Sequence, residues 1–311
     1  MNGAISHPLG RGMSNEARGL WLGALGVAIF ALTLPMTRLA TGPADAPQLS
    51  PWFVTFGRAA LAGVLSVFYL LATRSPLPRG AQVRQLGLTA LGVVLGFPLL
   101  MALGLRQVQA VHASVILGVL PLATAVMAAV ATRQKPAWSF WACAALGSGL
   151  VVAYAALTAP AGGIGIHWAD LLLLGAVLAA SFGYVSGARL TAELGAKRVI
   201  CWVLVLSLPF TLPAALATWP EHAVRTASWA GFVYVALFSM WIGFFAWYRA
   251  LDIGGAVRVS QVQLIQPFLS MLFAVPVLDE RLDAVTLCFG AAVIATVFIG
   301  KRLPAGRASA R

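Results

Sequence analysis

Five aromatic side chains recur at helical spacing in the apolar segment 229–250. Neighbouring members are three or four residues apart, which places them on one stripe of an α-helix: Tyr234, Phe238, Trp241, Phe245 and Tyr248. Such a stripe can stack on flat or apolar ligands, or it can pack as a seam against a neighbouring helix. Trp241 lies far from either end of the segment, so its indole N–H needs a partner inside the protein. Both interpretations stay open, and the five residues are candidate substrate contacts.

A polar face interrupts another apolar segment, 258–278. Gln263, Gln266 and Ser270 fall at positions i, i+3 and i+7, on one side of a helix. An amide side chain both donates and accepts hydrogen bonds, which suits the ammonium and carboxylate groups of a zwitterion. Because an unpaired amide is costly in apolar surroundings, this face must meet another helix or a water-filled cavity. We expect it to line a cavity.

Two further segments carry weaker candidate contacts. Ser181 and Tyr184 share a helical face in 168–188, and Phe30 and Thr33 share one in 19–40. Helix packing explains these pairs as well as ligand binding does.

Two titratable or charged residues lie inside apolar segments. His112 could titrate near neutral pH, or it could be a hydrogen-bonded structural residue. Arg58 lies deeper in its segment than a loop charge should. We expect Arg58 to reach outward or to pair with Asp45 or Asp170.

Composition decides where these segments reside. Of the 311 residues, 60% are hydrophobic and 10% are charged, whereas a soluble domain carries about 25% charged residues. So few charges cannot solvate the surface of a soluble protein of this length. In a soluble protein the formal net charge of +12 would suggest a nucleic-acid partner, but that inference fails in a chain with so few charges for its apolar content. The chain is therefore predicted to be a polytopic membrane protein whose partner is the lipid bilayer, not a nucleic acid.

Uncharged runs of about 20 residues match a hydrocarbon core about 30 Å thick. They predict an all-α integral membrane protein with ten transmembrane helices, at 19–40, 52–73, 85–105, 108–132, 137–159, 168–188, 199–219, 229–250, 258–278 and 284–300. Residues 1–18 and 301–311 are predicted to be tails. Most of the 21 Lys and Arg residues fall on the side of both tails, and most acidic residues fall on the other side. Since cytoplasmic loops carry the excess of basic residues, both termini are predicted to be cytoplasmic.

The chain contains an internal repeat. At an offset of 146 residues, six positions in the first half are matched in the second: Leu105, Ala110, Val111, Ser114, Pro121 and Ala128 by Leu251, Ala256, Val257, Ser260, Pro267 and Ala274. The halves 19–159 and 168–300 each hold five spans, so they must cross the membrane in opposite senses. Such inverted repeats are typical of transporters that rock about a midplane site. Pro121 and Pro267 are candidate hinges, or they are tolerated kinks.

These residues carry a family resemblance. Leu251, Ala256, Ser260, Pro267, Asp279-Glu280-Arg281-Leu282 and Gly290 resemble the second repeat of the EamA-type transporters of the drug/metabolite transporter superfamily. The first half offers a weaker match in Ala110, Ser114, Leu120-Pro121-Leu122 and Gly147, with Gln134-Lys135-Pro136 where the family often has Glu-Arg-Leu. The resemblance implies a ten-helix basket around a central cavity, lined mainly by spans 1, 3, 4, 6, 8 and 9. It further implies export of small metabolites, and bacterial members include exporters of aromatic and other amino acids. We also expect the protein to lie in the inner (plasma) membrane of a bacterium and to work as a monomer.

The sequence lacks the signatures of an enzyme or a metal site. There is no GxSxG, HExxH or pair of midspan aspartates, and the three cysteines lie within spans without metal-binding spacing. We therefore expect no catalytic residue, metal or cofactor.

The predicted activity is export of amino acids with aromatic or large apolar side chains. Drugs, nucleobases or sugar derivatives are the alternative cargo, and a channel and an intramembrane enzyme are the competing classes of protein. Since no Asp or Glu lies in the middle of a span, we expect transport down the substrate gradient, with His112 as the one titrating group.

Overall fold

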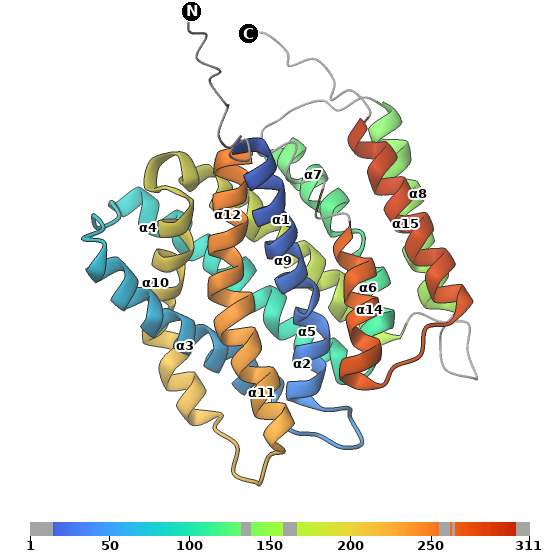
Figure 1. Ribbon diagram of the computed structural model, residues 1–311, viewed down its shortest axis with the longest axis horizontal. Coiled ribbons are helices and arrows are strands. Elements are labelled where there is room, and N and C mark those ends of the chain that lie inside the picture. Colours follow the sequence, from blue (N-terminus) through green and yellow to red (C-terminus); the bar gives the residue numbers. More distant parts are fainter. Residues whose placement is uncertain (1–14, 132–137, 158–166, 255–261, 263–264, 303–311) are drawn as a thin grey trace, which may run out of the picture.

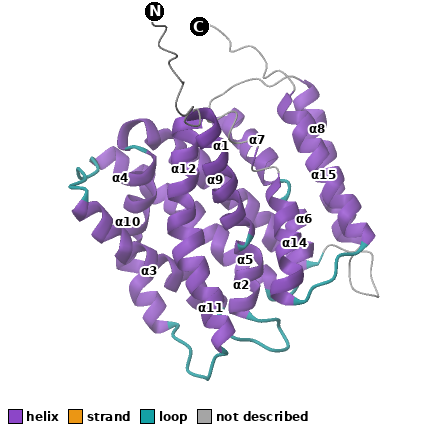
Figure 2. Cartoon of the chain, in the orientation of Figure 1, coloured by secondary structure: helices purple, strands orange, loops and turns teal. Residues whose placement is uncertain are grey.

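The computed structural model describes residues 15–131, 138–157, 167–254, 262 and 265–302. Every regular element among these residues is helical (Figures 1 and 2). In the first half these elements are α1 (Asn15–Ala31), α2 (Thr33–Thr41), α3 (Pro51–Ala72), α4 (Gly80–Ala90), η1 (Leu91–Gly96), α5 (Phe97–Leu105), α6 (Ala110–Leu117), α7 (Leu120–Ala131) and α8 (Trp138–Leu157). In the second half they are α9 (Trp168–Leu194), α10 (Ala196–Ala217), α11 (Thr226–Tyr234), η2 (Val235–Ile242), α12 (Gly243–Gly254), α14 (Gln266–Leu278) and α15 (Ala284–Arg302).

Seven stretches of the described chain are long and apolar enough to cross a membrane. They are Ala17–Thr41, Pro51–Ala72, Gly80–Leu105, Ala110–Ala131, Trp168–Thr191, Lys197–Ala217 and Thr226–Trp247. The predicted spans 137–159 and 284–300 correspond to α8 and α15, and α14 covers the part of the predicted span 258–278 from Gln266 onward. α14 and α15 contain shorter apolar stretches. The protein is thus an all-helical, multi-pass membrane protein, while the count of ten spans and the inverted relation of its halves stay predictions.

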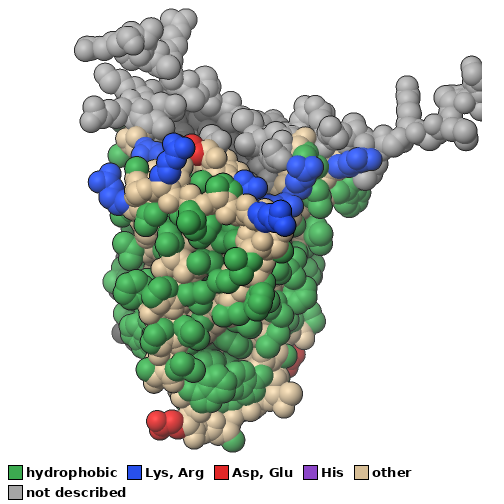
Figure 3. All heavy atoms as spheres, turned by 90° about the vertical axis from the view of Figure 1, so that its left-hand side faces the viewer, with side chains coloured by type: hydrophobic (Ala, Val, Ile, Leu, Met, Phe, Trp, Pro, Cys, Tyr) green, Lys and Arg blue, Asp and Glu red, His purple; other side chains and the backbone are tan. Residues whose placement is uncertain are grey.

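The helix pairs that pack together join distant parts of the chain. α1 lies along α12, α3 along α10, α5 and α7 along α9, and α8 along α15. Figure 3 shows a broad hydrophobic band across the visible face of the bundle, with Lys and Arg side chains gathered near one end of it. The start of α1 and the end of α15 lie at the same end of the bundle in Figure 1.

Proline explains the break between α1 and α2. Pro35 has no N–H, so the carbonyl of Ala31, four residues earlier, loses its helical partner. The Ser270 hydroxyl of α14 donates to this carbonyl at 2.8 Å. A buried side chain of one half thus completes the backbone hydrogen bonding of the other.

Two other predicted spans depart from α-helical geometry. The third contains the π-helical segment η1 and the eighth contains η2, and these spans hold equivalent places in the predicted repeat. At η1 the backbone comes close to α9, because a Cβ added to Gly92 would lie 2.6 Å from the Ala179 carbonyl oxygen. Glycine is required at this contact.

The two predicted hinge prolines occupy matching positions at helix starts. α6 ends at Leu117 and α7 begins at Leu120, directly before Pro121. α14 begins at Gln266, directly before Pro267. A proline is well tolerated in the first turn of a helix because its missing N–H would be unpaired there in any case. Whether the helices move about these points stays a prediction.

Candidate functional site

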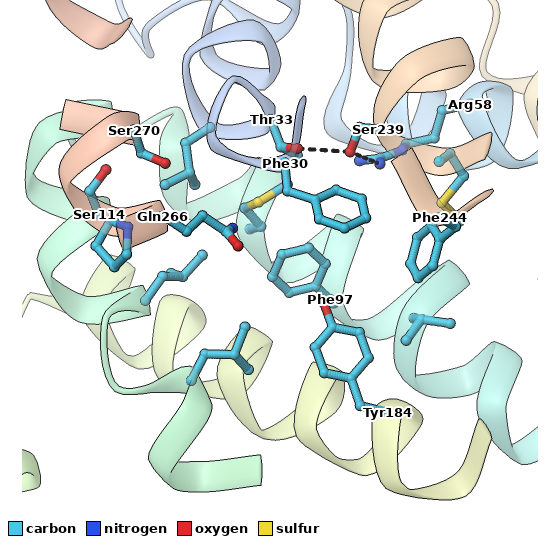
Figure 4. Close-up of a pocket in the computed structure, with 17 residues that line it drawn as sticks. Phe30, Thr33, Arg58, Phe97, Ser114, Tyr184, Ser239, Phe244, Gln266 and Ser270 are labelled. Atoms are coloured by element: carbon cyan, nitrogen blue, oxygen red, sulfur yellow. Dashed lines mark hydrogen bonds between the residues drawn. The ribbon is translucent and has the colours of Figure 1, made fainter. Parts of the chain in front are cut away.

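A cavity lies where helices of both halves meet (Figure 4). Its atom-free space is about 780 Å³, including the part that opens to the surroundings. The 17 lining residues come from α1, α2, α3, η1, α5, α6, α7, α9, η2, α12 and α14. All six spans that the family resemblance assigned to the cavity contribute, and α3 of the second span contributes as well.

Aromatic rings form much of the cavity wall. Phe30 of α1, Phe97 of α5, Tyr184 of α9 and Phe244 of α12 surround its centre in Figure 4. The rings of Phe30 and Phe244 meet edge to face, with centroids 5.2 Å apart and planes at 66°. Such a wall offers apolar area and ring faces to a flat or aromatic solute.

A polar chain crosses one side of the cavity. The hydroxyl oxygens of Thr33 in α2 and Ser239 in η2 lie 2.8 Å apart, within hydrogen-bonding distance. Ser239 also accepts a hydrogen bond of 3.0 Å from Nη2 of Arg58, which is only 2% exposed. The expectation that Arg58 pairs with Asp45 or Asp170 is wrong, because its one hydrogen bond to a described group goes to a hydroxyl and no described carboxylate pairs with it.

The predicted polar face of the ninth span reaches the cavity in part. Gln266 and Ser270 line it together with Pro267. The Ser270 hydroxyl is engaged with the Ala31 carbonyl, whereas the side-chain oxygen Oε1 of Gln266 is buried without a hydrogen-bond partner in the described structure. Gln263 lies outside the described residues.

The described residues of the aromatic stripe in the eighth span do not line the cavity. Tyr234 donates to the Ile29 carbonyl at 3.0 Å and stacks on Phe238, with ring centroids 5.2 Å apart. Trp241 and Phe245, 4.9 Å apart, pack beside the cluster formed with α10. The side chain of Tyr248 is not among those described. None of the other four lines this cavity, so their role in binding stays a prediction.

The π-helical segment η2 changes which side chains of this span share a face. A stripe at positions i, i+4 and i+7 assumes 3.6 residues per turn, but a π-helical turn is wider and rotates all later side chains. With Val235–Ile242 in this geometry, the residues that face the cavity are Ser239, Met240 and Phe244. Sequence periodicity alone could not select them.

The remaining two candidates are engaged in polar contacts outside the cavity lining. Ser181 accepts a hydrogen bond of 3.3 Å from the Thr124 hydroxyl. Nε2 of His112 lies 2.7 Å from Oδ1 of Asp170, and the second oxygen of Asp170 accepts from the N–H of His167 at 3.1 Å. Their predicted contact with substrate is therefore not made within this cavity.

Glu280 joins the two halves from the segment between α14 and α15, which lies at the end of the bundle away from the start of α1 (Figure 1). Its two carboxylate oxygens accept from the N–H groups of Ala110 and Val111, each at 2.8 Å, in the first turn of α6. Burial raises the pKa of the Glu280 carboxyl, although the two N–H donors and nearby Arg38 oppose this change. We call the contact between Glu280 and the first turn of α6 the outer latch, because this end of the bundle is predicted to lie outside the cytoplasm.

Several residues of the cavity could not be found from the sequence. Phe97, Met240 and Phe244 carry no pattern that separates them from other apolar helix residues. Arg58 does carry a signal, since a cation deep in an apolar run is costly and often functional. The structural explanation for so deep an arginine would be pairing with a carboxylate. The structure shows a hydrogen bond to the Ser239 hydroxyl instead.

Comparison with known proteins agrees with this architecture. The profile of the EamA-like transporter family matches residues 17–155 and again 167–300. A Bacillus subtilis (strain 168) protein named "Uncharacterized transporter YdeK" is 40% identical over 291 residues, covering 93% of this chain and 99% of the relative. A Streptantibioticus cattleyicolor protein named "Probable terminal-alkyne amino-acid exporter" is 26% identical over 298 residues, covering 94% of this chain and 96% of that protein.

A solved crystal structure also resembles the chain. It superimposes with a TM-score of 0.63 at 15% identity, covering 93% of this chain and 99% of the other. At that identity the likeness concerns the fold alone. The two family matches span most of the chain, and they make this protein a transporter rather than an enzyme. The chain belongs to the EamA-like transporter family.

Proposed function

We propose that this transporter exports amino acids with aromatic or large apolar side chains from the bacterial cytoplasm. The observation that carries the proposal is the cavity, in which four aromatic rings surround a space bordered by polar side chains. The rings suit the apolar part of such a solute. The unpartnered oxygen of Gln266 suits an ammonium group.

The relatives support the amino-acid class. One of them, over nearly its whole length, bears the name of an amino-acid exporter. The other is named only as a transporter, so the cavity itself must supply the argument for the cargo.

The proposed transport cycle is alternating access between the two halves. Ser270 of α14 bonds to α1, and Glu280 bonds to α6, so contacts between the halves exist both beside the cavity and at the latched end. We propose that Pro121 and Pro267, each beside a helix start, let the helices bend as these contacts exchange. Transport would run down the substrate gradient without a midspan carboxylate.

The proposed orientation places both termini in the cytoplasm and the outer latch on the opposite side of the plasma membrane. Support comes from the basic end of the bundle in Figure 3 and from the preference of Lys and Arg for cytoplasmic ends. In this arrangement one chain contains a complete cavity, and we propose that it functions as a monomer.

Counterflow in proteoliposomes tests the cargo. Vesicles loaded with unlabelled phenylalanine, leucine, adenine, glucose or a planar cationic drug are assayed for uptake of the same labelled solute. The amino acids should exchange saturably and the other solutes should not. Exchange of a base, sugar or drug in place of the amino acids would contradict the proposal, and unsaturable flux would indicate a channel.

A pair of matched variants ties the activity to this cavity. Phe244→Ala removes a ring from the wall, and Phe210→Ala removes a ring that is 77% exposed on α10. We expect Phe244→Ala to raise the apparent KM for phenylalanine and Phe210→Ala to leave it unchanged. Equal effects would show that the cavity wall does not contact the solute.

A further inference from the structure

Arg58 differs from the other cavity residues because it is a buried cation without a counter-ion among the described groups. It lies within α3 and is only 2% exposed. Nη2 donates to Ser239, while Nε and Nη1 have no hydrogen-bond partner in the described structure. A charged group in these surroundings is strongly disfavoured unless another charge or several hydrogen bonds compensate it.

Three described carboxylates that could have paired with Arg58 are bound elsewhere. Asp170 faces His112 at the end of α9, and Glu280 is bound by the first turn of α6. Glu193 accepts from the side chain of Gln82 at 2.7 Å. The 17 residues that line the cavity include no Asp or Glu. The guanidinium therefore faces a cavity whose described walls carry no negative side chain.

The orientation of the guanidinium is set by its one bond. Ser239 is held by Thr33 at 2.8 Å and receives Nη2 of Arg58 at 3.0 Å, so three helices share this contact. In Figure 4 the Arg58 head group lies beside Ser239 on the cavity wall, near the aromatic rings. Its unused N–H donors lie in a planar group, which matches the two oxygens of a carboxylate.

We propose that Arg58 binds the carboxylate of the transported solute. The substrate is then an organic acid with an aromatic or apolar body, and its amino group is not needed for this contact. This inference rests on transport through the cavity and narrows the proposed cargo to carboxylates. Amines without a carboxylate are excluded, because they would place a second positive charge beside Arg58.

Matched ligands test the inference on the purified full-length protein. The four probes share one ring and differ in charge: phenylalanine, 3-phenylpropionate, phenylalanine amide and 2-phenylethylamine. Binding is measured as the ligand-induced rise in the midpoint of thermal unfolding in detergent. Phenylalanine and 3-phenylpropionate should raise the midpoint, and the amide and the amine should not. Equal responses to acid and amide, or no response to either acid, would overturn the role of Arg58.

Variants of Arg58 separate binding from structure. For the two acids, Arg58→Gln should raise the Kd by about tenfold to a hundredfold, the range for hydrogen bonds to a charged group. Arg58→Lys keeps the charge but not the planar donor group, so its Kd for the acids should lie between those of the wild type and Arg58→Gln. The ligand-free Arg58→Gln protein should be as stable as the wild type or more stable, since it loses an uncompensated charge. Arg84→Gln, which removes an exposed arginine of α4, is the matched control and should bind normally.

The outcomes distinguish this inference from the proposed function. If Arg58→Gln binds both acids as the wild type does, the inference fails even where amino-acid counterflow succeeds. If 3-phenylpropionate binds through Arg58 but amino acids do not exchange, the inference stands and the proposed cargo is wrong. Should Arg58→Gln not fold, the comparison of acid with amide on the wild type still decides, and a purely structural arginine would show no preference for the acid.

Discussion

Removing the outer latch should open the cavity toward the side opposite the termini. Glu280→Ala deletes both oxygens that accept from Ala110 and Val111 at 2.8 Å. The loop between α14 and α15 then loses its hold on the first turn of α6, where the N–H groups have no helical partner of their own. We expect this contact to stabilise the state that is closed on this side, so its loss should favour the open alternative.

The magnitude follows from the number of bonds. A hydrogen bond to a charged group contributes about 1.5–3 kcal/mol. Because Glu280 is 8% exposed and its burial has a cost, we take about 2 kcal/mol for both bonds together. This value corresponds to about a thirtyfold change in the ratio of closed to open molecules. Glu280→Gln keeps one acceptor oxygen and should have a smaller effect.

Cysteine accessibility measures the open population. All three native cysteines are replaced, and Met101→Cys places a reporter on the cavity wall in α5. A membrane-impermeant maleimide, added to intact cells, should label this cysteine about thirtyfold faster with Glu280→Ala. Glu221→Ala, which removes an exposed acid in another loop, is the control.

Two results would refute this reasoning. If Glu280→Ala is labelled at the wild-type rate, the latch does not hold the cavity closed. If Glu221→Ala accelerates labelling equally, the effect is one of surface charge rather than of the two hydrogen bonds. A thermal unfolding scan of each variant confirms that labelling reports on folded protein.

Three other predictions concern single contacts. Ser270→Ala leaves the Ala31 carbonyl without its donor and should lower the free energy of unfolding by about 1–3 kcal/mol, measured by thermal and chemical unfolding in detergent. Gly92→Ala brings a methyl group within 2.6 Å of an α9 backbone oxygen and should destabilise the protein by about 1–3 kcal/mol or more, whereas Gly87→Ala has open space and should not. Since burial raises the pKa of Glu280, the latched state binds its proton more tightly than an open, hydrated state does. Acidification from neutral pH toward the ordinary Glu range should therefore lower the labelling rate of the Met101→Cys protein relative to that of its Glu280→Gln variant at the same pH, a ratio that cancels the loss of reactive thiolate common to both.

The helices can be placed from the sequence because partition into a bilayer depends on local composition. The predicted span 52–73 corresponds to Pro51–Ala72, and 199–219 corresponds to Ala196–Ala217. Ends are less predictable: α9 runs on to Leu194, beyond the predicted 188, because a helix continues into the headgroup region without an apolar requirement. The first helix likewise begins at Asn15, within the predicted tail.

From the sequence, cavity-lining residues can be predicted only where a polar side chain marks one face of an otherwise apolar helix. Gln266 and Ser270 stand out because polar atoms in an apolar helix need partners. The partner of Arg58 cannot be predicted, since pairing depends on which helices meet, and sequence separation does not show this. Ser239, which holds Arg58, is 181 residues away in the chain.

Several polar contacts of this site arise where the helices depart from regular α-helical geometry. The break at Ala31 frees a carbonyl for Ser270, and η2 turns Ser239 toward Arg58. A regular α-helix uses its backbone groups internally and presents one stripe with a period of 3.6 residues. Where that geometry fails, polar atoms become available in the middle of an apolar bundle, and a stripe predicted from a period of 3.6 residues no longer identifies the face that lines the cavity. For such helices, a buried cation like Arg58 is therefore a stronger indicator of the site than the pattern of aromatic residues.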